Sequence, residues 1–142
     1  MGLVNSFAIS QSALQAERLR MDVAANNLAN INSTRTPSGG PYRRQTVQLS
    51  AIGGGPSFAS LLAGQGGAAG GVRVDAVSED PSPPRRVYEP SNPDAGPDGF
   101  VEYPNVDMSI EMTDMISASR SYQANVTALN SIKAMAQKAL EI

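Results

Sequence analysis

The chain has 142 residues, of which 41 % are hydrophobic but only 5 % aromatic, and its net charge is −2. We therefore expect one domain with a thin core and no basic surface for nucleic acid. Cysteine and histidine are absent, which removes thiolate chemistry, the most frequent general base and the commonest transition-metal ligand. No run reaches the roughly 18 apolar residues of a membrane span. The composition therefore predicts that the chain is neither an enzyme nor a transmembrane protein. We expect it to bind no cofactor, metal, nucleic acid or small-molecule substrate.

Glycine and proline divide the chain into three parts. All ten Pro and twelve of the thirteen Gly lie in the middle part, and Gly2 is the exception. Because these residues interrupt helices, we expect long helices only at the two ends. We assign residues 1–36 to an N-terminal helix, 37–104 to a β/loop region with a flexible loop at 53–71, and 105–142 to a C-terminal helix.

The N-terminal part repeats large apolar residues at intervals of seven, namely Phe7, Leu14, Met21 and Leu28. Small or polar residues occupy the contact positions between them. This pattern predicts a helix with a narrow apolar seam, suited to one partner helix rather than to a wide core. Residues 32–34 and Pro37 are expected to end the helix.

The middle part alternates short strand patterns with turn residues. Apolar and polar residues alternate at 46–49 and 72–77, which predicts strands. Residues 87–89 and 100–103 flank a Pro/Gly/Asp-rich connection that contains Asp98-Gly99, and this arrangement predicts a hairpin. Residues 53–71 contain eight Gly and are expected to form a flexible loop.

The C-terminal part follows a 4-3 spacing of contact positions. Its apolar members are Met108, Met112, Met115, Tyr122, Val126, Leu129, Ala136 and Leu140, and Ser119 and Lys133 interrupt them. The pattern predicts a long, narrow-seamed helix, which Asn105 or Asp107 can cap. We interpret Asp107, Glu111 and Asp114 as a solvated face that complements the helix dipole, in preference to catalytic carboxylates.

Two narrow-seamed helices at opposite ends of a chain would most simply pair with each other. Their other faces are rich in Ala, Ser and Asn. Small residues allow further helices to approach closely, and Asn can fix register through hydrogen bonds. Composition alone leaves open whether these faces are solvated or contact neighbouring molecules.

Two short motifs point to ligands but fail on context. Residues 64–69 fit the dinucleotide pattern GxGxxA, yet a strand pattern follows where a helix is required. A calcium loop that began at Asp94 would place Gly96 and Asn105 at two ligand positions, the second of which needs a bidentate Glu. We interpret both segments as loops or turns.

Residues 12–32, with the core Ala25-Asn26-Asn27-Leu28-Ala29-Asn30, resemble the N-terminal signature of flagellar rod and hook proteins. Residues 117–125 resemble the C-terminal helix of the same family. Three further stretches, 39–44, 79–88 and 100–106, are similar to the proximal rod subunits of that family. Together these stretches make up 53 of the 142 residues.

The resemblance implies a mainly α fold, in which the long N- and C-terminal helices form an antiparallel coiled coil and the Pro/Gly-rich middle carries short β-strands. It implies a structural subunit of the proximal rod, in the periplasm-spanning part of the flagellar basal body. Such a subunit polymerises with itself and with other proximal and distal rod proteins, and contacts the adaptor to the MS ring. The rod transmits motor torque and is required for motility, and its subunits are exported by the flagellar type III apparatus.

Two groups of site residues follow from these interpretations. The first is a helix-pairing seam of Phe7, Leu14, Met21, Leu28, Met112, Met115, Tyr122, Val126, Leu129 and Leu140. The second, implied by the family motifs, is a set of assembly contacts at Asn26, Asn27, Asn30 and Asn125. The main alternative is a helical-hairpin secretion substrate or needle-like component, which the Pro-rich middle and the Ala-Asn-Asn motif disfavour.

Overall fold

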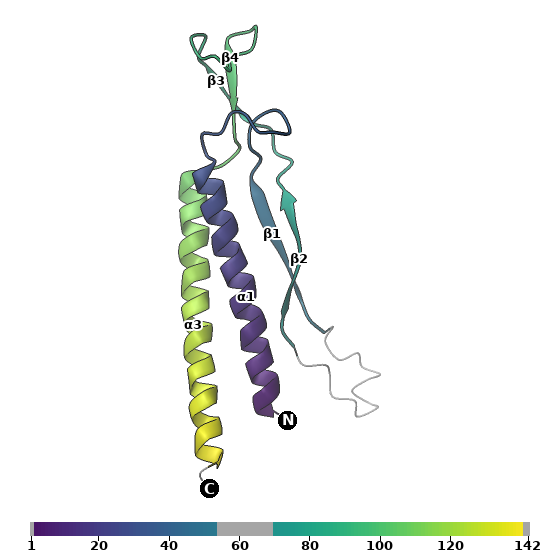
Figure 1. Ribbon diagram of the computed structural model, residues 1–142, viewed down its shortest axis with the longest axis vertical. Coiled ribbons are helices and arrows are strands. Elements are labelled where there is room, and N and C mark those ends of the chain that lie inside the picture. The colour runs from purple at the N-terminus through teal and green to yellow at the C-terminus, as the bar shows by residue number, and fades with distance from the viewer. Residues whose placement is uncertain (1, 54–69, 141–142) are drawn as a thin grey trace.

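The computed structural model describes residues 2–53 and 70–140 (Figure 1). In this part of the chain, the first element is the long helix α1 (Gly2–Ala29) and the last is the long helix α3 (Met108–Leu140). Four strands lie between them in the sequence. The loop expected at 53–71 lies largely outside the described residues, as does the side chain of Leu140. The prediction of two terminal helices with short strands between them is confirmed.

The two helices lie side by side and antiparallel, so that both chain ends are found at the same end of the molecule (Figure 1). α1 ends at Ala29, although the segment without Gly or Pro continues to residue 36. Beyond Ala29 the backbone tightens, because Ile31 N–H bonds to the Leu28 carbonyl at 3.4 Å and Ser33 N–H to the Asn30 carbonyl at 3.0 Å. Asn and Ser side chains compete with helical hydrogen bonds, which explains the early end.

α3 begins with a side-chain cap. Asp107 Oδ1 accepts hydrogen bonds from the backbone N–H groups of Ser109 at 2.8 Å and Ile110 at 3.2 Å, which satisfies two donors that the first helical turn leaves free. Of the two caps that the sequence allowed, Asp107 is therefore confirmed. Asn105 instead accepts a bond from Arg44 N–H at 3.0 Å.

The strands form two separate antiparallel pairs. β1 (Gln45–Ala51) pairs with β2 (Val72–Glu79), with a register shift between Gln48 and Leu49. β3 (Arg85–Tyr88) pairs with β4 (Phe100–Tyr103), so the predicted hairpin is confirmed. The β1–β2 hairpin runs beside α1, and the β3–β4 hairpin lies at the end of the molecule opposite the termini (Figure 1).

Among the residues that the structure describes, the buried apolar ones are few and mostly small: Ala16, Val23, Ala24, Val101, Pro104 and Ala118. Ser10, Asn27 and Glu111 are buried with them. A core of this kind contributes little apolar burial, as the composition indicated. Polar contacts must therefore carry an unusual share of the chain's internal specificity.

Candidate functional site: the helix seam and the polar cluster beside it

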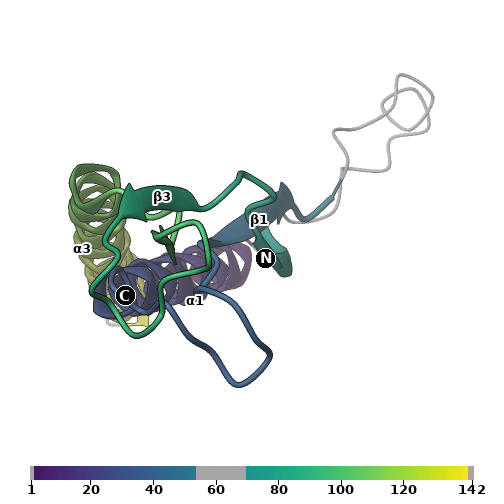
Figure 2. The same ribbon diagram turned by 90° about the horizontal axis from the view of Figure 1, so that it is seen from above.

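α1 is the central element, with α3 on one side and the β1–β2 hairpin on the other (Figure 2). Its buried residues include Ala16, Val23, Ala24 and Asn27. A groove of about 470 Å³ runs between α1 and α3, and Met21, Met115 and Tyr122 are among the residues that line it. The structure thus brings three of the predicted seam residues together.

The other predicted seam residues differ in exposure. Leu14, Leu28 and Leu129 are partly buried. Phe7, Met112 and Val126 are exposed by 44 %, 52 % and 37 %. The pairing role of the seam as a whole therefore stays a prediction.

The most buried positions on α3 are Glu111 and Ala118, each one residue before a position that the sequence pattern placed in the seam. The 4-3 spacing is met equally well by the series 111, 115, 118, 122, 125, 129, 132 and 136. Where two helices approach closely, Ala fits between them better than Met. The spacing therefore does not by itself determine the inward face of α3: a small residue, Ala118, and the partners of Glu111 on α1 and at Arg44 favour this series.

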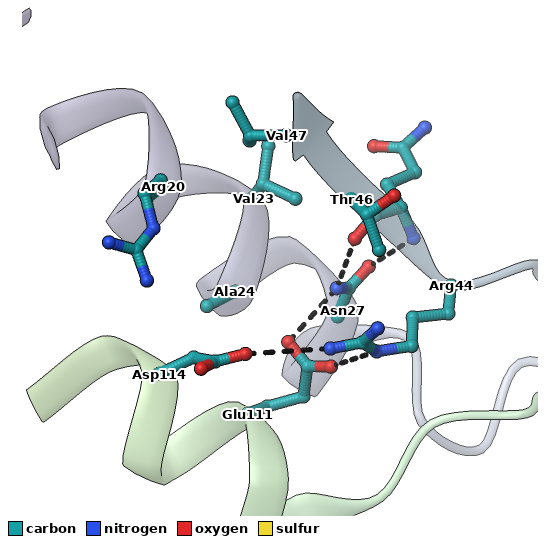
Figure 3. A pocket seen from close by; sticks show the side chains of 10 residues that line it. Arg20, Val23, Ala24, Asn27, Arg44, Thr46, Val47, Glu111 and Asp114 are labelled. Atoms are coloured by element: carbon teal, nitrogen blue, oxygen red, sulfur yellow. Dashed lines mark hydrogen bonds and ion pairs between the residues drawn. The ribbon is translucent and has the colours of Figure 1, made fainter. Parts of the chain in front are cut away.

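A polar cluster joins α1, α3 and the start of β1, and Asn27 lies at its centre (Figure 3). The Asn27 amide donates to the Gln45 carbonyl at 2.9 Å and to Glu111 Oε2 at 3.0 Å. Its oxygen accepts from Gln45 N–H at 2.9 Å and from the Tyr42 hydroxyl at 2.9 Å. An amide side chain offers two donors and two lone pairs, so every hydrogen-bonding position of Asn27 is used.

The pair of bonds to Gln45 imitates a strand. A neighbouring β-strand would also accept the N–H and donate to the C=O of one residue. Asn27 therefore serves as a one-residue strand partner for the beginning of β1. This contact lies inside the subunit, whereas the family motif had predicted Asn27 to contact a neighbouring subunit.

Glu111 is a charged residue with only 1 % of its surface exposed. Arg44 Nε donates to Glu111 Oε1 at 2.5 Å, and the same guanidinium lies 3.5 Å from Asp114 and 3.8 Å from Asp80. Burial of a lone carboxylate is very costly, so this pairing is what permits it. The interpretation of Glu111 as part of a solvated face is wrong, although Asp107 and Asp114 are at least partly exposed.

Tyr42 is held as a hydrogen-bond donor in this cluster. Burial, and then the charges of Glu111 and Glu79, raise the pKa of the Tyr42 hydroxyl. Each of these influences disfavours the phenolate. The hydroxyl therefore keeps the proton that it donates to Asn27.

Ser12 of α1 holds the end of the β1–β2 hairpin that is distant from Asn27, where β2 begins. Its hydroxyl donates to the Ile9 carbonyl at 2.7 Å and accepts from Val72 N–H at 3.1 Å. Ser12 and Asn27 are 15 residues apart (27 − 12), about 22 Å along a helix. Asn27 holds Gln45 at the start of β1, and Ser12 holds Val72, which pairs with Ala51 at the end of β1. From Gln45 to Ala51 the strand spans about 20 Å, so the distance between Ser12 and Asn27 matches the length of β1.

The remaining asparagines of the family motifs make local contacts. Asn30 Nδ2 lies 3.0 Å from the backbone oxygen and from Oδ1 of Asn26, and Asn125 Nδ2 donates to the Ser121 carbonyl at 2.9 Å. Asn26 is exposed, and Asn30 and Asn125 are partly exposed. Their role in assembly stays a prediction.

Sequence reasoning did not identify Tyr42, Arg44 and Glu111 as a cluster. A signal was present, because Tyr42 and Arg44 belong to a stretch, 39–44, that resembles proximal rod subunits. A second signal was a Glu one residue away from an apolar seam. Neither indicates which residues meet, because Arg44 and Glu111 are 67 positions apart.

Both terminal helices match models of flagellar proteins. The family described as flagella basal body rod protein matches residues 7–35, and the C-terminal region of the flagellar basal body rod FlgEFG proteins matches residues 98–142. These matches include most of α1 and all of α3. They indicate the class of the chain, that of flagellar basal-body rod proteins.

Relatives that match along almost the whole chain identify the family within this class. The flagellar basal-body rod protein FlgC of Bacillus subtilis (strain 168) is 47 % identical over 146 residues, covering 97 % of this chain and 96 % of that protein. FlgC of Salmonella typhimurium (strain LT2) is 45 % identical and FlgC of Borreliella burgdorferi 44 %, each covering 100 % of this chain and 98 % of the relative. The chain belongs to the FlgC family of flagellar basal-body rod proteins. It is a structural subunit of the basal-body rod and not an enzyme.

No helix in the described part of the chain contains a segment long and apolar enough to cross a membrane.

Proposed function

We propose that the α1–α3 pair is the assembly element of the subunit: an antiparallel coiled coil whose outer surface packs against neighbouring rod subunits. The neighbours are further copies of this chain and other proximal and distal rod proteins, and the adaptor to the MS ring at one end. A contact that does not close on itself generates a helical assembly. Many such contacts in parallel let a rod carry motor torque across the periplasm.

The observation that carries this proposal is an exposed apolar row on α3. Met108, Met112 and Ile116 are exposed by 54 %, 52 % and 53 %. They follow one another at intervals of four, so they lie on one helical face. Exposed rows of large apolar residues are typical of surfaces that bind other proteins.

A small core together with an exposed apolar row suits a subunit that is exported first and assembled afterwards. We propose that the chain is exported by the flagellar type III apparatus and that cells need it for swimming. A core as small as that of this chain limits the free energy of unfolding. Burial of the exposed row against neighbours then adds stability where the rod is built.

The test replaces two exposed residues, Met112→Asp and Ile116→Asp, in cells that lack the native copy. Both positions face outward, so we expect the helix content of the purified variants to match the unmodified chain. We expect the variants to be absent from purified basal bodies and the cells to be non-motile. Gln123→Asp is the matched control, because Gln123 is an exposed polar residue on the same helix.

Normal swimming with both apolar variants would show that this row does not contact neighbours. If Gln123→Asp abolished motility as well, the effect would come from added charge on α3 rather than from the apolar row. Either result would contradict the proposal.

A further inference from the structure

The apolar contacts between α1 and α3 do not by themselves define one alignment. The partly buried apolar residues of α1 that are seven apart are Leu14, Met21 and Leu28, and those of α3 are Met115, Tyr122 and Leu129. If one helix slid by seven residues, most of these side chains would again meet a large apolar residue at nearly the same angle.

The polar cluster does distinguish these alignments. In the structure Asn27 lies opposite Glu111, at 3.0 Å. A slip of seven residues would place Asn27 opposite either Ala118, which has no polar side-chain atom, or Pro104, which precedes α3. Glu111 would lose Asn27, and Arg44 could not keep its contacts to both helices. Its neighbour Gln45 is bonded to Asn27 of α1, whereas its own N–H is bonded to Asn105, which lies just before α3.

We propose that Asn27, Glu111 and Arg44 are positioning residues that select the register of the helix pair. A buried charge whose partners exist in one alignment only penalises every other alignment. The cluster therefore acts on the choice between structures more than on the free energy of unfolding. This inference concerns contacts within one subunit and does not depend on which neighbours the helix pair binds.

Register matters for a rod subunit because the two helices present one composite surface. A slip of seven residues displaces one helix along the other by about 10 Å. The exposed row on α3 and the outer face of α1 would then no longer match a neighbour together. One misaligned subunit would leave unpaired apolar surface within the shaft.

The test exchanges the ion pair for an apolar pair in the double variant Glu111→Leu/Arg44→Met. Spin labels on cysteines introduced at Gln11 of α1 and Ala128 of α3 report the register by pulsed electron resonance. Both positions are exposed, and the chain contains no other cysteine. Circular dichroism and urea unfolding monitor folding, and the labels are also measured in basal bodies in which unlabelled chain is in excess.

The matched control is Glu17→Leu/Arg20→Met. Glu17 and Arg20 also form an ion pair, at 3.0 Å, with side-chain exposures of 15 % and 30 %. Both residues belong to α1, so this pair can form in any alignment and carries no information on register. It controls for the general effect of removing a partly buried charge pair next to α3.

We expect the unmodified chain and the control to show one distance between the labels. The cluster variant should retain the helix content and urea resistance of the unmodified chain but show a second population, displaced by about 10 Å along the helix axis. A single native distance in the cluster variant would overturn the proposal. So would loss of helix content in that variant alone, because the cluster would then act on folding and not on register.

Discussion

The two ends of the helix pair are built differently. At the junction end, which comprises residues 20–29 of α1 and 108–118 of α3, buried side chains include Val23, Asn27 and Ala118, and the polar cluster joins three elements. At the terminal end, which comprises residues 2–9 and 130–140, most of the described side chains are exposed, with Val4 at 75 % and Met135 at 54 %.

The difference indicates a division of labour along one pair of helices. The junction end obtains its contacts from the chain itself, including strand β1 and the segment before it. The terminal end has apolar side chains, and no strand among the described residues runs beside its outermost turns (Figure 1). We infer that internal structure orders the junction end, whose exposed row of Met108, Met112 and Ile116 stays available to neighbours. The terminal end, in contrast, depends on neighbouring subunits for its order.

The largest effect is expected from Arg44→Ala. The substitution removes the cation beside buried Glu111 and leaves that carboxylate without its charge partner. Breaking a buried ion pair from one side costs about 3–5 kcal/mol. We expect urea unfolding to show a loss of this size, whereas Arg18→Ala, at an exposed position of α1, should change the free energy of unfolding by less than about 0.5 kcal/mol. Equal effects of the two substitutions would remove the distinction between cluster and surface.

A smaller loss is expected from Met21→Asp, which tests the seam itself. Met21 lines the groove with Met115 and Tyr122, so the new carboxylate would be partly desolvated against apolar neighbours. We expect a loss of about 2 kcal/mol in the free energy of unfolding and loss of motility. Gln15→Asp, at an exposed position of the same helix, serves as the control. Swimming at normal speed with Met21→Asp would contradict the paired-helix interface.

Much of this architecture could be predicted from the sequence, because it depends on local signals. Gly and Pro limited the long helices to the two ends, Asp107 stood where a cap was needed, and Asp98-Gly99 marked the turn between β3 and β4. The left-handed φ of 76° at Gly99 shows why glycine is required there. Such features depend on neighbouring residues in the chain.

The polar cluster could not be predicted in the same way. Its members lie far apart in the sequence, and nothing local distinguishes Glu111 from the solvated Asp114 one turn later. The inward face of α3 was ambiguous for a related reason, since positions 111 and 112 both satisfy a 4-3 spacing. Only the approach of α1, and the arrival of Arg44 beside it, determines which residue is buried.

A still smaller effect is expected from Tyr42→Phe, which removes one hydrogen bond from Asn27 and leaves the rest of the cluster intact. We expect a loss of about 1 kcal/mol at neutral pH. The raised pKa of Tyr42 also has a consequence at alkaline pH. Above about pH 10 the unfolded tyrosine loses its proton while the folded one retains it, so the free energy of unfolding falls as pH rises.

Urea unfolding between pH 8 and pH 11 separates these two contributions. The alkaline decline should be shallower in Tyr42→Phe than in the unmodified chain, because the group that causes part of it is gone. Tyr88→Phe is the control, since Tyr88 is an exposed tyrosine on β3. Identical pH dependence in all three proteins would show that the surroundings of Tyr42 do not hold its hydroxyl in the protonated form.

The central claim is that the chain itself orders the junction end and that assembly orders the terminal end. Hydrogen–deuterium exchange of the purified chain, compared with the same chain in basal bodies, measures this directly, because amide protection reports local opening. We expect residues 20–29 and 108–118 to be protected in both samples, and residues 2–9 and 130–140 only in basal bodies. Equal protection of both ends in the purified chain would contradict the claim, as would terminal helices that exchange fast in the assembled rod.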